Sequence, residues 1–405
     1  DPFFTVGFRA MGPSLRSLCP HHCRTLTADP GADLARLVAQ VRATPMQAFA
    51  YDSLGRSHRI NITATALLDL MFDTDYQPSL RAAVPGAVLA ALNGDGAALA
   101  RLIRESRRFD DLGSPREFSV ARYATVCETT PLPWDPGTPI DQRPAVAQQR
   151  IAAVPPNAFL PFDPASVVED EIDLCLRWPD VPRPPSATPP PPYPAVPTLI
   201  LQGGEDLRTP PEWSARVAAQ IPGAKRLVIP GLGHSPLSAY FRCAPEAVLR
   251  FARGEKPPSH CPRAPTGVPA IAPAPASFGS LPGYRGLPRK VGRTVRAIAA
   301  TLDDLRLTLS PAFIASSGGG LRGGSWSVRR DGRLKLNDYQ AVTGVTVSGG
   351  GDRRLRLRIA GTEAAAGTVT LRKHGRLRGR LGGRRIKLRL PTPRGTSSRV
   401  ATLAG

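Results

Sequence analysis

The stretch LILQGGEDLRTPPEW at residues 199–213, together with LVIPGLGHSPL at residues 227–237, decides the fold. Each stretch opens with a short apolar run of the kind that is buried in a parallel sheet, and each run leads into a glycine-rich turn. Between them, the segment from Trp213 to Gln220 is expected to form a helix that Thr209 caps and two prolines open. Strand, helix and strand in so short a segment are typical of an α/β layer.

Two polar residues, Asp206 and His234, follow these strands. Open α/β sheets place ligand and catalytic groups at the carboxyl ends of their strands. A Ser-His-Asp hydrolase needs a buried carboxylate that holds an imidazole in one tautomer, and the imidazole takes the proton of the nucleophile. In α/β hydrolases the chain order is nucleophile, acid, histidine, and this pair obeys it. An aspartate in a glycine-rich turn is more often a turn former, but the position of this pair after consecutive strands favours a triad.

The strings GGEDLRTPPE and GLGHS resemble the C-terminal core of secreted α/β-hydrolase exopeptidases of the tripeptidyl aminopeptidase and proline iminopeptidase group. The resemblance covers residues 1–263. It implies that Asp206 is the triad acid, that His234 is the general base, and that residues 1–195 form a helical cap over the active site. Further residues that match the family are DPFF at 1–4, Cys19, Cys23-Arg24, Asp29-Pro30, Asp33-Leu34, Asp52, Gly55-Arg56, Cys127, Cys175, Trp178-Pro179, Cys243 and Cys261.

The nucleophile is missing from this pattern. A nucleophile elbow, G-x-S-x-G, carries its serine on a strained turn between strand and helix, and no such pentapeptide occurs in the 405 residues. In the family the elbow precedes the position that matches Asp1, so we expect the chain to be the later part of an enzyme. We predict an incomplete serine hydrolase, an aminopeptidase-like exopeptidase that, when complete, cleaves a short peptide or acyl substrate through an acyl-enzyme. The alternative is an inactive relative or a binding protein.

The chain carries 53 basic and 32 acidic residues, which are unevenly distributed. Residues 281–405 contain 26 of the basic and 6 of the acidic residues, so the net charge of +21 resides almost entirely there. Alternation of arginine with apolar residues, as at 354–359 and 385–390, indicates a small antiparallel β domain with one arginine-lined face, and Ser348 to Gly351 are expected to form a turn. This face is expected either to be solvated or to bind a polyanion such as an anionic cell-surface polymer. Nucleic acid is disfavoured because few aromatic residues are present to stack on bases.

Composition shifts divide the chain. One proline-rich segment lies before the α/β layer and another lies after it. The first is expected to be extended and the second to be a linker. In the first part, Asp29 and Pro30 are expected to start one helix and Pro85 another. The fold class is therefore α/β, a partial hydrolase core with a helical cap and an added antiparallel β domain. The expected parts are a helical cap with a proline-rich return at 1–195, the core piece at 196–263, a linker at 264–283 and a basic β-rich domain at 284–405.

Six cysteines, all outside the basic segment, suit three disulfides in an oxidising compartment, so we expect a secreted or cell-envelope protein. The cluster Cys19-Pro20-His21-His22-Cys23 is the one rival metal site, but no second ligand pair completes it, and we predict neither metal nor cofactor. No apolar run reaches the ~18 residues that a membrane span needs. Glu128 is a candidate for binding a substrate ammonium, with an exposed helix-end charge as the alternative. The cysteines are Cys19, Cys23, Cys127, Cys175, Cys243 and Cys261.

Overall fold

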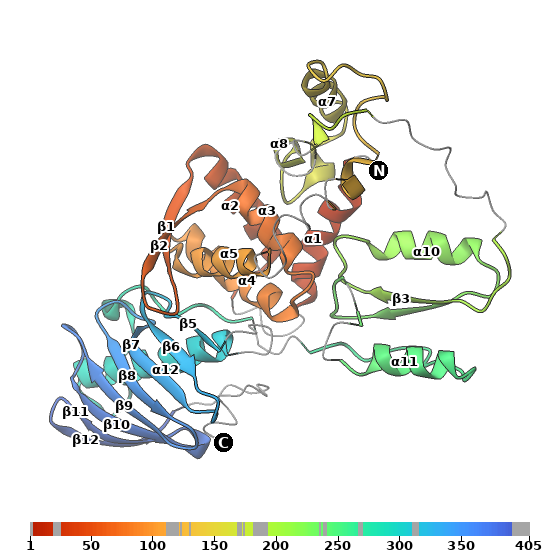
Figure 1. Ribbon diagram of the computed structural model, residues 1–405. Coiled ribbons are helices and arrows are strands. Elements are labelled where there is room, and N and C mark those ends of the chain that lie inside the picture. Colours follow the sequence, from red (N-terminus) through yellow and green to blue (C-terminus); the bar gives the residue numbers. More distant parts are fainter. Residues whose placement is uncertain are drawn as a thin grey trace.

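The chain folds into three parts: a helical region, a small α/β layer and a C-terminal sheet backed by one helix (Figure 1). None of the described helices is both long and apolar enough to cross a lipid bilayer. The computed structural model describes residues 3–18, 26–110, 121, 124–128, 131–167, 172, 175–180, 193–234, 236–237, 241–265, 270–309 and 316–390.

The helical region comprises the described residues up to 180. Asp29 caps α2 as expected, because its Oδ1 accepts hydrogen bonds from the amides of Gly31 and Ala32 at 2.9 and 3.2 Å and Pro30 takes the first helical position. Apolar faces of these helices meet in one core that includes Leu37 and Leu68. The elements are α1 (Thr5–Ser17), α2 (Pro30–Ala43), β1 (Met46–Tyr51), β2 (Ser57–Ile62), α3 (Ala64–Asp73), α4 (Pro78–Leu92), α5 (Ala97–Asp110), α7 (Arg143–Ala152), η2 (Pro156–Phe159) and α8 (Pro164–Val167).

Two features of this region differ from the sequence-based expectation. The antiparallel hairpin β1–β2 was not predicted, and it packs on α5. Pro85 does not open a helix but lies inside α4, which begins at Pro78. Proline inside a helix removes one hydrogen bond, and here tertiary packing outweighs that loss, since Pro85 and its neighbour Gly86 are both buried.

The α/β layer consists of two parallel strands between two helices. Strand β3 (Leu199–Gly203) pairs with β4 (Lys225–Ile229), and Figure 1 shows α10 (Pro211–Gln220) on one side of the pair and α11 (Cys243–Ala252) on the other. Both strands, and helix α10 between them, fall where the sequence predicted them. The expected Thr209 cap of α10 is wrong, because Pro210 occupies the N-cap position and the Thr209 hydroxyl donates to Asp206 instead.

The C-terminal part is an eight-stranded antiparallel meander in the order β12 to β5, and α12 (Arg289–Thr308) packs on its inner face. Side chains alternate between buried and exposed along β9, as predicted, and β11 shows the same alternation. The expected turn at Ser348–Gly351 is wrong, since these residues belong to β8. The remaining elements are η4 (Phe278–Ser280), β5 (Ser317–Gly319), β6 (Gly323–Val328), β7 (Leu334–Gln340), β8 (Thr346–Gly351), β9 (Leu355–Ala360), β10 (Gly367–Arg372), η5 (Lys373–Gly375), β11 (Arg376–Leu381) and β12 (Arg384–Arg389).

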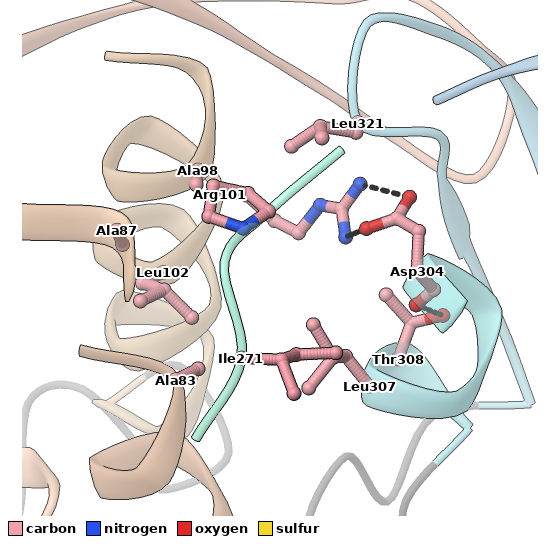
Figure 2. Close-up of a pocket in the computed structure, with 11 residues that line it drawn as sticks. Ala83, Ala87, Ala98, Arg101, Leu102, Ile271, Asp304, Leu307, Thr308 and Leu321 are labelled. Carbon is pink, nitrogen blue, oxygen red and sulfur yellow. Dashed lines mark hydrogen bonds and ion pairs between the residues drawn. The ribbon is translucent and has the colours of Figure 1, made fainter. Parts of the chain in front are cut away.

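A buried ion pair joins the helical region to the C-terminal part. Figure 2 shows Arg101 of α5 reaching Asp304 of α12 beside a small cavity of about 30 Å³, and two hydrogen bonds of 2.7 and 2.9 Å connect the side chains. The Tyr339 hydroxyl donates to the same carboxylate at 2.6 Å. The end of the segment expected as a linker, 264–283, packs into the C-terminal part, because Phe278 and Leu281 are buried in its core. The two parts are therefore packed together rather than tethered.

Candidate functional site

The ends of β3 and β4 bring Asp206 and His234 together. The two strands pair in parallel, with Gly203 opposite Ile229, so the turns that follow them leave the sheet at the same edge. These turns approach closely: a Cβ atom on Gly203 would lie 1.9 Å from the carbonyl oxygen of Gly233. Only glycine fits at residue 203, and this close approach allows the two polar side chains to meet.

The Asp206 carboxylate and the His234 imidazole are within hydrogen-bond distance. His234 Nδ1 lies 3.1 Å from Oδ2 and 3.3 Å from Oδ1 of Asp206, whose side chain is only 4% exposed. The carboxylate also accepts hydrogen bonds from the amides of Arg208 and Thr209 at 2.9 and 2.8 Å and from the Thr209 hydroxyl at 2.7 Å. This arrangement orients one imidazole nitrogen toward the acid and leaves Nε2 as the nitrogen that can exchange a proton with a substrate or nucleophile.

The environment favours the charged form of both side chains. Burial opposes ionisation of Asp206, but hydrogen bonds from His234 and Thr209 lower its pKa below the usual value. The hydrogen bond with Asp206 raises the pKa of His234, and burial opposes this rise. The site therefore holds an ionised acid beside an imidazole that binds a proton more strongly than a free histidine.

The turn between α3 and α4, in the helical region, contacts the backbone next to this pair. Asp75 accepts hydrogen bonds from the amides of Leu207 and Arg208 at 2.8 and 3.1 Å, next to Asp206. Arg81 donates to Asp75 at 2.6 Å, and both side chains are almost fully buried. Burial raises the pKa of Asp75 to about 7, despite the opposing charge of Arg81. This turn therefore holds the backbone that carries the acid.

Arg81 also links the acid turn to the histidine turn. A Cβ atom on Gly233 would lie 2.6 Å from Arg81 Nη2, so the guanidinium packs directly against the residue before His234. Tyr76 makes an edge-on contact with the His234 ring, with centroids 5.7 Å apart. Sequence reasoning missed Asp75, Tyr76 and Arg81. The one signal for Asp75 and Arg81 is their charge in the mostly apolar text that runs from α3 through the turn into α4, and Tyr76 has no such signal.

A cavity of about 310 Å³ lies beside Asp206, between α1 and the turn that follows β3. Its wall mixes charged and small residues, among them Arg9, Ser14, Glu205 and Glu212. Glu205 is held in place, since Arg263 donates to it at 2.9 Å and the Gly231 amide also donates to it. Ligand sites usually occupy clefts of about 300 to 1,000 Å³, so this space suits a small ligand.

The remaining predicted residues lie in other surroundings. Glu128 accepts a hydrogen bond from the indole of Trp178, next to the disulfide between Cys127 and Cys175. A second disulfide joins Cys243 to Cys261. The expected partners Cys19 and Cys23 lie outside the described residues. Within the described part, no three histidine, cysteine, aspartate or glutamate side chains form a group suited to a metal ion.

Comparison with known proteins supports a hydrolase relationship for the α/β layer. Residues 162–261 match the family model Abhydrolase_4, described as TAP-like protein. The matched segment contains β3, β4, α10 and α11, and with them Asp206 and His234. This part of the chain is thus similar to the TAP-like α/β hydrolases. No curated protein and no solved structure gives a significant match.

Proposed function

We propose that Asp206 and His234 are the acid and the general base of a serine-hydrolase site, and that the complete protein is an exported exopeptidase that cleaves short peptides. The observation that carries the proposal is the hydrogen-bonded pair at the ends of two parallel strands, within a segment similar to TAP-like hydrolases. The order of acid before histidine in the chain fits an α/β hydrolase.

The chemistry follows from the orientation of the imidazole. Asp206 accepts a hydrogen bond from the N–H at His234 Nδ1, so Nε2 can take the proton of a serine hydroxyl as its oxygen attacks the acyl carbon. The imidazolium then gives this proton to the leaving amine as the C–N bond breaks, which leaves an acyl-enzyme. Water, activated by the same imidazole, hydrolyses the acyl-enzyme and restores the hydroxyl. Because the 405 residues contain no G-x-S-x-G, we assign the nucleophile to a residue outside this sequence.

A short substrate and an oxidising location are supported by two further observations. The cavity beside Asp206, about 310 Å³, suits a small ligand, and Glu212 in its wall supplies a carboxylate that complements a free N-terminal ammonium. We assign the helical region the role of a cap, because the turn after α3 contacts both catalytic turns. The disulfides Cys127–Cys175 and Cys243–Cys261 favour an exported protein.

The test uses the longest reading frame that contains this sequence, including the codons upstream of Asp1. We expect a fluorophosphonate probe to label one serine and the protein to hydrolyse fluorogenic aminoacyl or tripeptidyl substrates. Asp206→Asn and His234→Ala should each lower kcat/KM by roughly 10³-fold or more, whereas His260→Ala, an exposed histidine, should leave it unchanged. A folded full-length protein that neither reacts with the probe nor hydrolyses these substrates would instead be an inactive relative or a binding protein.

A further inference from the structure

The outward face of strands β9 to β12 carries parallel rows of cationic side chains, and two of these rows cross all four strands. In the first row Arg356 lies opposite Thr370, Thr370 opposite Arg378, and Arg378 opposite Lys387. All three cations are exposed, because their apolar neighbours along each strand point to the core. The second row runs beside it in the same way, with Arg358, Thr368, Arg380 and Arg385. We call the six exposed cations of the two rows the cationic face.

The cationic face has an internal repulsion that the described residues do not relieve. Arg378 lies directly opposite Lys387, and Arg380 directly opposite Arg385. Like charges in this position destabilise a sheet. No ion pair forms between the cationic face and any carboxylate in the described part of the chain. Asp338 is an acidic residue of the same sheet, but it lies on the more distant β7 and accepts a hydrogen bond from Ser348 at 2.6 Å. A bound anion would relieve this repulsion.

Protection of a sheet edge explains only part of the pattern. Charged side chains on an edge strand prevent pairing with other molecules, and β12 is an edge strand of the meander. Strands β9 and β11, however, lie inside the sheet, with partners on both sides, and they carry four of the six cations. The opposite face of these strands is already occupied, because α12 packs there with Val295, Ile298 and Leu305 buried. The cationic face is thus the side that is open to a partner.

The spacing of the cations fits a linear polyanion. Neighbouring strands are about 4.8 Å apart and alternate residues along a strand about 6.7 Å apart, so each row spans about 14 Å and the two rows run side by side. A flexible polymer with a phosphate in each repeat can place several anions on such a lattice at once. Bidentate contact between guanidinium groups and phosphate strengthens each interaction.

Two observations favour a polymer without bases over nucleic acid. Aromatic side chains that could stack on bases are absent from the cationic face, and Trp326 and Tyr339 of the same sheet are buried. The disulfides Cys127–Cys175 and Cys243–Cys261 indicate an oxidising compartment, where nucleic acid is not the usual polyanion.

We propose that the cationic face binds a base-free phosphodiester polymer of the cell envelope and so holds the protein at an anionic surface. Binding is electrostatic, with the arginine rows contacting consecutive phosphates. It is independent of the hydrolase site, since the two lie in different parts of the fold.

The test measures binding of fluorescently labelled poly(glycerol phosphate) to the whole chain by anisotropy, between about 50 and 200 mM salt. The double variant Arg378→Gln/Arg380→Gln removes two central cations. Its matched control, Arg329→Gln/Arg330→Gln, removes the same charge from exposed positions at the β6–β7 turn.

We expect Arg378→Gln/Arg380→Gln to raise Kd about tenfold or more. It should also reduce the slope of log Kd against log salt by about 1.5, because each phosphate contact contributes about 0.7 to 0.9. The control should change Kd less than about twofold.

Three results would overturn the proposal. The first is the absence of saturable binding at the lowest salt concentration. The second is an equal loss in both double variants, which would mean that net charge alone attracts the polymer. The third is tighter binding of a DNA duplex with a matched number of phosphates, which would identify a nucleic-acid face instead. Thermal unfolding verifies that both variants fold, and we expect Arg378→Gln/Arg380→Gln to be at least as stable as the parent, because it removes two like-charge contacts.

Discussion

At the scale of single residues, the hydrogen bond between Asp206 and His234 controls the proton affinity of the imidazole. Asp206 is buried and ionised, and it accepts a hydrogen bond from the N–H at Nδ1 of His234. The folded-state pKa of His234 is therefore higher than that of an unfolded histidine. A raised histidine pKa contributes stability that is complete below about pH 6.5 and is lost as the pH rises through the folded-state value.

We expect a proton NMR titration to give His234 a pKa above 6.5 and the Asp206→Asn variant to return it to or below that value. The reason is that an asparagine side chain supplies no charge to stabilise the imidazolium. His260, exposed and remote from Asp206 along the chain, serves as an internal reference in the same spectra. A His234 pKa that does not respond to the variant would show that the two side chains do not interact in solution. This measurement needs no catalytic activity.

At the scale of elements, the turn between α3 and α4 supports the site. Asp75 and Arg81 are both buried, and Asp75 also holds the amides of Leu207 and Arg208. At pH 8, above the raised pKa of Asp75, Asp75→Ala should lower the free energy of unfolding by about 3 to 5 kcal/mol, because it leaves a buried guanidinium without its counter-charge. Urea unfolding measures this loss.

A double variant separates the charge effect from a general packing defect. In Asp75→Leu/Arg81→Met no buried charge is left unpaired, so we expect it to recover much of the stability that Asp75→Ala loses. The His234 pKa provides a second readout, since a shifted acid turn would weaken the contact with Asp206 even in a stable protein. Equal instability of the single and the double variants would mean that the turn matters for packing alone.

Local patterns predicted the elements that depend on local chemistry. The apolar runs of β3 and β4, the Asp29 cap of α2 and the alternation in β9 all appear where the sequence indicated them. Local sequence patterns gave wrong predictions where contacts between residues distant in the sequence determine the backbone conformation. The glycines of β8 suggested a turn, but their backbone instead lies between two neighbouring strands: a Cβ on Gly350 would meet the Leu334 carbonyl oxygen at 1.9 Å.

The same distinction applies to the candidate site. Asp206 and His234 could be predicted because each follows its strand directly in the sequence. Asp75 could not, since it is 132 residues away from the amide of Leu207 that it contacts. Thr209 was assigned to the helix because threonine is a common cap, but the nearby carboxylate of Asp206 competes successfully for its hydroxyl.

At the scale of the whole molecule, both disulfides should contribute to stability, and the one that closes the longer loop should contribute more. Cys127–Cys175 spans 48 residues and Cys243–Cys261 spans 18. Chain entropy predicts losses of about 4 and 3 kcal/mol when each pair is replaced by serine, with the longer loop giving the larger loss. Urea unfolding of the two double-serine variants checks both the size and the order. Unchanged stability in both variants would contradict the prediction.

We expect the ion pair between Arg101 and Asp304 to make the helical region and the C-terminal sheet unfold as one unit. Its residues are 203 positions apart, the carboxylate also accepts the Tyr339 hydroxyl, and all three side chains are buried. Arg101→Met leaves Asp304 as a buried charge without its guanidinium partner, so we expect a loss of about 3 to 5 kcal/mol. The exposed pair of Arg333 and Asp331 is the control, and Arg333→Met should cost less than about 1 kcal/mol. Calorimetry should show one joint transition for the two parts in the parent and separate transitions in Arg101→Met. Separate transitions already in the parent would mean that the junction is too weak to couple them.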